Sequence, residues 1–168
     1  MLIFLVWNLD TKTSIRLPQV LPYPARFIIA MDTLPYVITA SWSNLESYVW
    51  KEEENGEYKC IATLRGHTQA ISCIASRGNL LVTGSGDGTC RVWDMTSFTC
   101  KQVLNECGGF VTCVAFGSDD RVVVGTRNNR IVSYNALTGE ILHQMNDVHR
   151  GEVLKLSVMR DNSIFSCG

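Results

Sequence analysis

The stretch GSGDGTCRVWD, residues 84–94, decides between two very different folds. Its three glycines stand at alternate positions after an apolar run, as they would in a phosphate-binding loop or in a tight turn between two strands. A dinucleotide-binding loop needs its third glycine at position 89, which is Thr89, and then a helix. The residues that follow have the β-branched and aromatic composition of a strand. The stretch therefore predicts a β-hairpin, in which the turn residues 86–88 tolerate positive φ.

The tryptophan near the end of this stretch is one of four aromatic residues that recur at a nearly fixed spacing. Trp7, Trp50, Trp93 and Tyr134 each follow a short β-branched or apolar run, and successive members are 43, 43 and 41 residues apart. Two further apolar runs precede each aromatic residue from Trp50 onward, and a polar turn with one more run follows. Each unit therefore has the pattern of four short antiparallel strands.

The repeating units predict an all-β fold. No segment shows a sustained helical spacing of apolar residues. The first two strands of each unit are apolar on both faces, which is typical of a sheet packed between two others. Four-stranded units at this period predict a β-propeller of about four blades, either a partial propeller or a strand-exchanged ring. The whole chain, 1–168, forms one repeat region, with blades near 1–20 (partial), 21–64, 65–105, 106–146 and 147–168 (partial).

The segment GHTQAISCIASRGNLLVTGSGDGTCRVWD, residues 66–94, closely resembles a repeat of the WD40 family. A Gly-His pair opens the unit at 66–67, Asp87 lies in the turn between the second and third strands, and a Trp-Asp pair closes the third strand at 93–94. The resemblance implies a WD40-type β-propeller, and the units of this chain also look like blades of F-box and WD repeat proteins.

The other units keep the period but depart from the motif. Tyr23 and Cys107 stand at the histidine position of their units, and Asn44 and Asn128 stand at the position of Asp87. His149 keeps the histidine, but a valine precedes it where the glycine belongs. The full motif therefore occurs once.

The resemblance implies a hydrogen-bonded chain of His67, a hydroxyl on the second strand, Asp87 and Trp93. The hydroxyl is Ser85 or Thr83, and we assign it to Ser85. A buried indole N–H needs an acceptor, a hydroxyl both accepts and donates, and a carboxylate orients an imidazole. We therefore expect these four residues to have a structural role.

We expect no catalytic, cofactor or metal site. The chain contains no Gly-x-Ser-x-Gly nucleophile elbow, and no two of its seven cysteines have the Cys-x-x-Cys spacing of many zinc sites. The Glu52–Glu54 run precedes an Asn-Gly turn, and we interpret it as a solvated hairpin loop. The sequence thus favours a non-enzymatic protein.

Charge and cysteine usage indicate which partners and which compartment to expect. The formal charge is −1, with 15 basic and 16 acidic residues, so neither nucleic acid nor an anionic membrane is expected as a partner. The apolar run at the N-terminus is short and lacks a preceding basic residue, so we interpret it as a strand and not as a targeting signal. Seven cysteines without a disulfide pattern, and no Asn-x-Ser/Thr sequon, indicate the cytoplasm or the nucleus.

The two ends of the chain carry complementary half-blades. The chain opens on a third strand, residues 2–8, and stops in a second strand, residues 163–168. Two explanations compete: the chain is a piece of a longer propeller, which we favour, or its half-blades join each other or those of a second copy. Because unpaired strand edges associate in water, we expect purified 1–168 to dimerise or aggregate.

A propeller without a catalytic set predicts a scaffold or adaptor that binds other proteins or peptides. The alternative is a substrate-recognition propeller of a ubiquitin ligase, in which Arg127 and Arg150 bind phosphorylated segments. Loops that precede the first strand and follow the second strand of each blade converge at the central channel. The candidate partner-binding residues in these loops are Trp42, Ser43, Thr68, Gln69, Phe110, Arg127 and Arg150.

Overall fold

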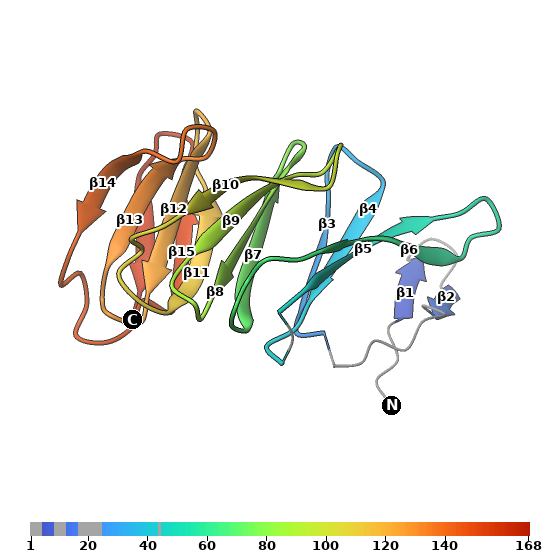
Figure 1. The fold of residues 1–168 in the computed structure, drawn as a ribbon, viewed down its shortest axis with the longest axis horizontal. Coiled ribbons are helices and arrows are strands. Elements are labelled where there is room, and N and C mark those ends of the chain that lie inside the picture. Colours follow the sequence, from blue (N-terminus) through green and yellow to red (C-terminus); the bar gives the residue numbers. More distant parts are fainter. Residues whose placement is uncertain (1–4, 9–12, 17–24, 44) are drawn as a thin grey trace.

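The computed structural model describes residues 5–8, 13–16, 25–43 and 45–168, and all regular elements in these residues are β-strands. Figure 1 shows three twisted sheets that stand side by side along the length of the molecule. The strands are β1 (Leu5–Asn8), β2 (Thr13–Arg16), β3 (Phe27–Ala30), β4 (Tyr36–Ala40), β5 (Ser47–Glu52), β6 (Tyr58–Leu64), β7 (Ile71–Arg77), β8 (Leu80–Ser85), β9 (Cys90–Asp94), β10 (Thr99–Leu104), β11 (Val111–Phe116), β12 (Arg121–Thr126), β13 (Ile131–Asn135), β14 (Ile141–Met145), β15 (Lys155–Val158) and β16 (Ile164–Cys167). The predicted all-β fold is confirmed.

Each of the three full sheets contains four consecutive antiparallel strands. Their orders are β3-β4-β5-β6, β7-β8-β9-β10 and β11-β12-β13-β14, and two further sheets are the pairs β1-β2 and β15-β16. The repeating aromatic residue lies on the third strand of each full sheet, where Trp50 pairs with Val37, Trp93 with Leu81 and Tyr134 with Val122. All three aromatic side chains are buried. The side chain of Trp7 lies outside the described residues.

The sheets are arranged around their first strands. β3 contacts β7, β7 contacts β11, and β11 contacts β15, so the first strands follow one another at the inside of the molecule. The hydrophobic core fills the space between neighbouring sheets: one cluster includes Leu81 and Trp93, a second Val111 and Val124. Such packing buries both faces of the second strand, and all six residues of β8 are buried. This is the arrangement of propeller blades.

A β-bulge near the start of the first strand links neighbouring sheets. The pairing of β7 with β8 shifts between Ile71 and Cys73, so Ser72 bulges out, and its Oγ lies within hydrogen-bonding distance of the Gly84 carbonyl of its own sheet and the Val111 carbonyl of the next sheet. Thr112 repeats this arrangement one sheet further on. The bulged position therefore lies where two blades meet.

The turn between β8 and β9 differs in detail from the prediction. Within residues 86–88 only Gly88 has a positive φ, at 82°, while Asp87 has a negative φ. In the next sheet Asn129 takes the same place with a φ of 60°, because asparagine is the residue after glycine that best tolerates this region. The hairpin prediction is confirmed, with the left-handed conformation at one residue.

The two half-sheets do not pair with each other in this chain. β1-β2 and β15-β16 form separate two-stranded sheets, and Figure 1 shows them at different positions along the long axis. Among the described residues, β16 has β15 as its only strand neighbour. The structure is thus a partial propeller with three full blades, and residues 2–4 of the predicted opening strand lie outside the described residues.

Candidate functional site

The predicted hydrogen-bonded chain runs through the second full sheet, with Thr83 as its hydroxyl. Trp93 Nε1 donates to Thr83 Oγ1 over 2.9 Å, Thr83 Oγ1 lies 2.8 Å from His67 Nε2, and His67 Nδ1 lies 2.9 Å from Asp87 Oδ2. The Asp87 carboxylate is only an acceptor, so the Nδ1–H of His67 donates to it. In a neutral ring Nε2 then accepts the Thr83 hydroxyl, which in turn accepts the indole N–H.

The assignment of this hydroxyl to Ser85 was wrong. Ser85 Oγ donates to the Gln69 carbonyl at 2.9 Å and accepts the Asp87 N–H at 3.1 Å, so it holds the turn together. Thr83 and Ser85 lie on the same face of β8, because side chains two apart share a face. Trp93 pairs with Leu81, which makes Thr83 its diagonal neighbour and leaves Ser85 one step too far away.

The electrostatics of the chain follow from burial and hydrogen bonding. Burial lowers the pKa of His67 and outweighs the opposite effect of Asp87, in agreement with a neutral ring. Burial disfavours the charged form of Asp87, but hydrogen bonds from the Thr68 N–H, from Thr89 and from His67 outweigh it and lower the pKa of Asp87 to about 2. The pair is thus a neutral imidazole held by an ionised carboxylate, which fits a structural role.

The other sheets keep parts of this chain. Trp50 Nε1 donates to Thr39 Oγ1 over 2.9 Å in the first full sheet. In the third full sheet the Tyr134 hydroxyl donates to the Asn105 carbonyl over 2.7 Å. His149 Nε2 lies 2.9 Å from Ser166 Oγ in the last half-sheet. Tyr23 and Asn44, predicted to replace the histidine and aspartate of the first sheet, lie outside the described residues.

Three of the predicted partner-binding residues line one hollow at the starts of the first strands β3, β7 and β11. Trp42, Phe110 and Arg127 line a hollow of about 340 Å³, which we call the channel mouth. The rings of Trp42 and Phe110 meet edge to face with centroids 6.1 Å apart, and the Arg127 guanidinium lies 4.2 Å from the Phe110 centroid. The remaining lining residues are Arg26, Phe27, Ser72, Thr112, Glu152 and Leu154.

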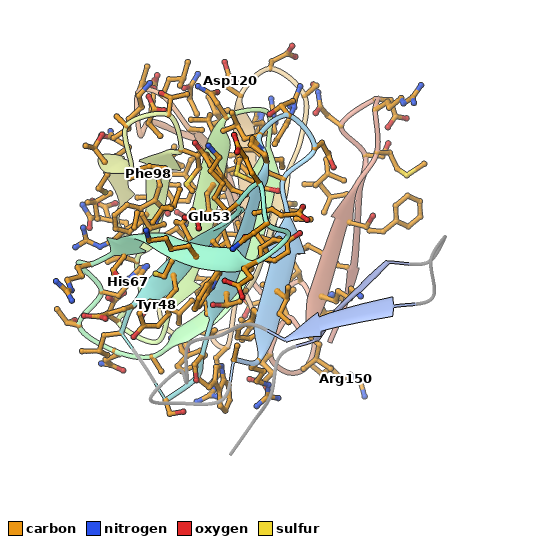
Figure 2. All side chains as sticks on the ribbon, turned by 90° about the vertical axis from the view of Figure 1, so that its right-hand side faces the viewer. Tyr48, Glu53, His67, Phe98, Asp120 and Arg150 are labelled. Carbon is orange, nitrogen blue, oxygen red and sulfur yellow. The ribbon has the colours of Figure 1, made fainter. Side chains whose placement is uncertain are left out.

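The other four predicted contact residues do not line the channel mouth. The Thr68 N–H donates to Asp87 at 3.0 Å, and Gln69 accepts the Ser85 hydroxyl through its carbonyl. Ser43 bonds to Ser41. Arg150 is exposed and lies at the lower edge of the molecule in Figure 2, well away from His67. Three of the seven candidate residues therefore meet in one hollow, and the other four lie outside it.

Sequence reasoning missed Arg26, Glu152 and Leu154. Phe27 pairs with Ala40 as Cys73 pairs with Gly84, so Arg26 stands at the bulge position that Ser72 and Thr112 occupy in the later sheets. Leu154 occupies the same position in the last half-sheet. Its N–H donates to the Cys167 carbonyl, just as the Arg26 N–H donates to the Ala40 carbonyl. Projecting the repeat onto this single position would have found both residues.

Glycine 86 gives the channel mouth its shape. Gly86 stands in the second full sheet at the turn position that Arg127 holds in the third. The Gly86 N–H donates to the Ala70 carbonyl and the Arg127 N–H donates to the Phe110 carbonyl, and each acceptor lies just before the first strand of its sheet. A Cβ atom at Gly86 would lie 2.8 Å from the Phe110 ring. The missing side chain thus makes room for Phe110 to lean across the second sheet towards Trp42.

The repeats match a known family model. The model described as WD domain, G-beta repeat matches residues 58–94 and 98–135. The chain belongs to the WD40 repeat family. Each WD40 match begins with the outer strand of one sheet and ends with the third strand of the next, from β6 to β9 and from β10 to β13. Each WD40 repeat therefore joins two neighbouring blades, and the resemblance drawn from residues 66–94 is confirmed.

Curated relatives match about two thirds or more of this chain. The CCR4-associated factor 4 homolog of Candida glabrata is 26% identical over 135 residues, which is 69% of this chain and 23% of the relative. Protein tipD of Dictyostelium discoideum is 32% identical over 123 residues, 71% of this chain and 20% of its own length. Cell division control protein 4 of Candida albicans is 31% identical over 129 residues, 67% and 19% respectively. The chain spans about a fifth to a quarter of these relatives.

The described residues contain neither a cluster of metal ligands nor a membrane-spanning helix. No three of their His, Cys, Asp or Glu side chains are grouped to hold a metal ion. None of their segments forms a helix of the length and apolar content that crosses a membrane. All seven cysteines are described, and each is a free thiol.

Proposed function

We propose that this chain is a non-catalytic interaction scaffold that binds a segment of a partner protein at the channel mouth. The observation that carries the proposal is the meeting of Trp42, Phe110 and Arg127, from two different blades, in one open hollow. Aromatic and arginine side chains are the residues that most often anchor protein interfaces. Trp42 is 45% exposed without a ligand, so a partner has aromatic surface to cover.

The experiment compares partner sets. The full chain, tagged and expressed in cells, is purified with its partners, and the same is done for Trp42→Ala and for Leu137→Ala. Leu137 is a matched control because it is 52% exposed on the turn between β13 and β14, outside the channel mouth. We expect Trp42→Ala to lose a set of partners that Leu137→Ala keeps. Identical sets for all three proteins would contradict the proposal.

A second candidate function is substrate recognition for a ubiquitin ligase, in which the propeller binds phosphorylated segments. Two guanidinium groups at the channel mouth, Arg26 and Arg127, support it because arginine pairs well with phosphate. We expect Arg26→Gln combined with Arg127→Gln to abolish capture of phosphorylated partners while unphosphorylated partners still bind. If the variant still binds both phosphorylated and unphosphorylated partners, this candidate function is contradicted.

The last half-sheet supports a further partner: the rest of a longer propeller or a second copy of the chain. His149 and Ser166 form the imidazole–hydroxyl part of the chain seen in the second sheet. No strand of the described residues pairs with the outer edge of β16, where a third strand would bring the aromatic donor. Light scattering on purified 1–168 tests this. Dimers or larger particles are expected, and a stable monodisperse monomer would contradict it.

We infer a cytoplasmic or nuclear location. Seven free thiols, four of them buried, support a reducing compartment, since disulfides form in oxidising ones. Imaging of the tagged full chain tests the inference, and a signal confined to secretory vesicles would contradict it.

A further inference from the structure

The channel mouth contains a row of alternating cationic and aromatic groups. The Arg26 guanidinium lies 4.6 Å from the Trp42 centroid, and Trp42 meets Phe110 edge to face. Phe110 in turn lies under Arg127, whose Nε is 3.1 Å from a carboxylate oxygen of Glu152. The row begins on the first full sheet, passes over Gly86 of the second, and ends on the last half-sheet.

The two ends of this row differ in charge. Arg127 is neutralised by Glu152, whereas Arg26 has no hydrogen bond or ion pair with a carboxylate among the described residues. Arg26 is exposed and held against Trp42, which directs its guanidinium without satisfying its N–H donors. Arg26 therefore offers a bound anion a fixed pair of donors.

The surroundings of Arg26 are apolar. Trp42 and Leu154 are 45% and 59% exposed, and both line the same hollow. A volume of about 340 Å³ accommodates one or two side chains of an extended peptide. The anion that fits is thus carried by a chain with a bulky apolar residue beside it.

We propose that the channel mouth binds a peptide segment in which an aspartate or glutamate pairs with Arg26 and a neighbouring apolar side chain packs on Trp42, Phe110 and Leu154. This inference rests on the proposed function and specifies its ligand. A carboxylate needs one guanidinium fork, which Arg26 supplies. A phosphate carries nearly two charges and needs a second cation, but Glu152 already holds Arg127 and would repel it.

The test uses random peptides displayed on phage and selected on the full chain. We expect sequences with an acidic residue next to an aromatic or large aliphatic residue to be enriched. The best peptide is then synthesised and titrated against wild type, Arg26→Gln, Trp42→Ala and the control Arg160→Gln, which removes an exposed charge outside the hollow. We expect Arg26→Gln and Trp42→Ala to weaken binding by about 10-fold or more, and Arg160→Gln to leave it unchanged.

The peptide itself supplies the second arm. Replacing its acidic residue by Gln should weaken binding about as much as Arg26→Gln does, and the two changes together should add little more. Peptides that depend on Trp42 but ignore Arg26 would overturn the inference and leave the proposed function standing. If the selected peptides bind equally well to the Arg26 and Trp42 variants, or if no peptide is selected, both the inference and the proposed function are overturned. Tighter binding of a phosphoserine version than of the glutamate version would overturn the carboxylate in favour of phosphate.

Discussion

The second and third full sheets solve the same packing problem with different chemistry. In the second sheet Trp93 donates to Thr83, which continues to His67 and Asp87. In the third sheet Val124 stands in place of Thr83, and the hydroxyl of Tyr134 donates to a backbone carbonyl instead. Both rings are nearly inaccessible and lie opposite an apolar residue of the neighbouring strand. The buried ring is thus the common requirement, and the polar chain is one way to satisfy it.

The residue at the histidine position also differs between the two sheets. Cys107 stands there in the third sheet, and the Tyr134 hydroxyl also lies 3.5 Å from its sulfur. Burial raises the pKa of Tyr134, and its hydrogen bond with Cys107 raises it further, so the phenol remains a neutral donor. A thiol and a backbone carbonyl therefore replace an imidazole and a carboxylate with the sheet geometry unchanged.

Removing the rings should have the largest effect, and it should be similar in the two sheets. Trp93→Ala and Tyr134→Ala each leave a large cavity between blades, and we expect each to lower the free energy of unfolding by about 3–5 kcal/mol. Urea denaturation followed by circular dichroism measures it. A cost for Tyr134→Ala below about 1 kcal/mol would show that only the complete motif holds a blade together.

Removing the second-strand hydroxyl should destabilise the second full sheet more than the first. Thr83→Val leaves both the Trp93 N–H and the His67 Nε2 without a partner, at about 1–3 kcal/mol for each buried group. The matched control is Thr39→Val in the first full sheet, where the hydroxyl has the Trp50 N–H as its one side-chain partner among the described residues, so its cost should be about half. Equal costs would mean that the imidazole contributes nothing to the chain.

The sequence predicted the architecture more fully than the site. Period and apolar alternation define every strand of the three full sheets, because strand formation depends on local patterns that each unit repeats. The choice between Thr83 and Ser85 required the register of β8 against β9, which one sequence does not contain. Arg26 was missed because its role depends on which residue bulges towards the channel. Trp42, Phe110 and Arg127 were predicted as candidates because loop residues of these types have few structural duties, and the structure places the three in one hollow.

Removing the hydroxyl of Ser85 tests that correction, with a smaller effect. Ser85→Ala breaks two hydrogen bonds of the turn but leaves the Trp93 chain intact, so we expect a cost of about 0.5–1.5 kcal/mol, below that of Thr83→Val. The same denaturation assay compares the two. A larger cost for Ser85→Ala would restore Ser85 to the chain.

Mild acid should have the smallest effect, confined to the second sheet. The pKa of His67 is lowered in the folded state, so the unfolded chain binds a proton more readily, and stability falls as pH drops through 6.5 towards the folded value. The contribution of Asp87, whose pKa is lowered to about 2, is lost only as pH falls from about 4 to 2.

Urea denaturation of wild type and His67→Gln between about pH 7.5 and about pH 5.5 isolates the histidine. The stability of wild type should decline more over this span than that of the variant. Parallel declines would contradict a neutral His67.

The most direct test of the blade arrangement is hydrogen exchange of the indole N–H groups, measured by NMR and assigned with single Trp→Phe variants. Trp50 and Trp93 occupy equivalent buried places and donate to Thr39 and Thr83, whereas Trp42 is 45% exposed at the channel mouth. The account predicts slow exchange at Trp50 and Trp93, fast exchange at Trp42, and faster exchange at Trp93 in Thr83→Val. Exchange at Trp93 as fast as at Trp42 in the wild-type chain would contradict it.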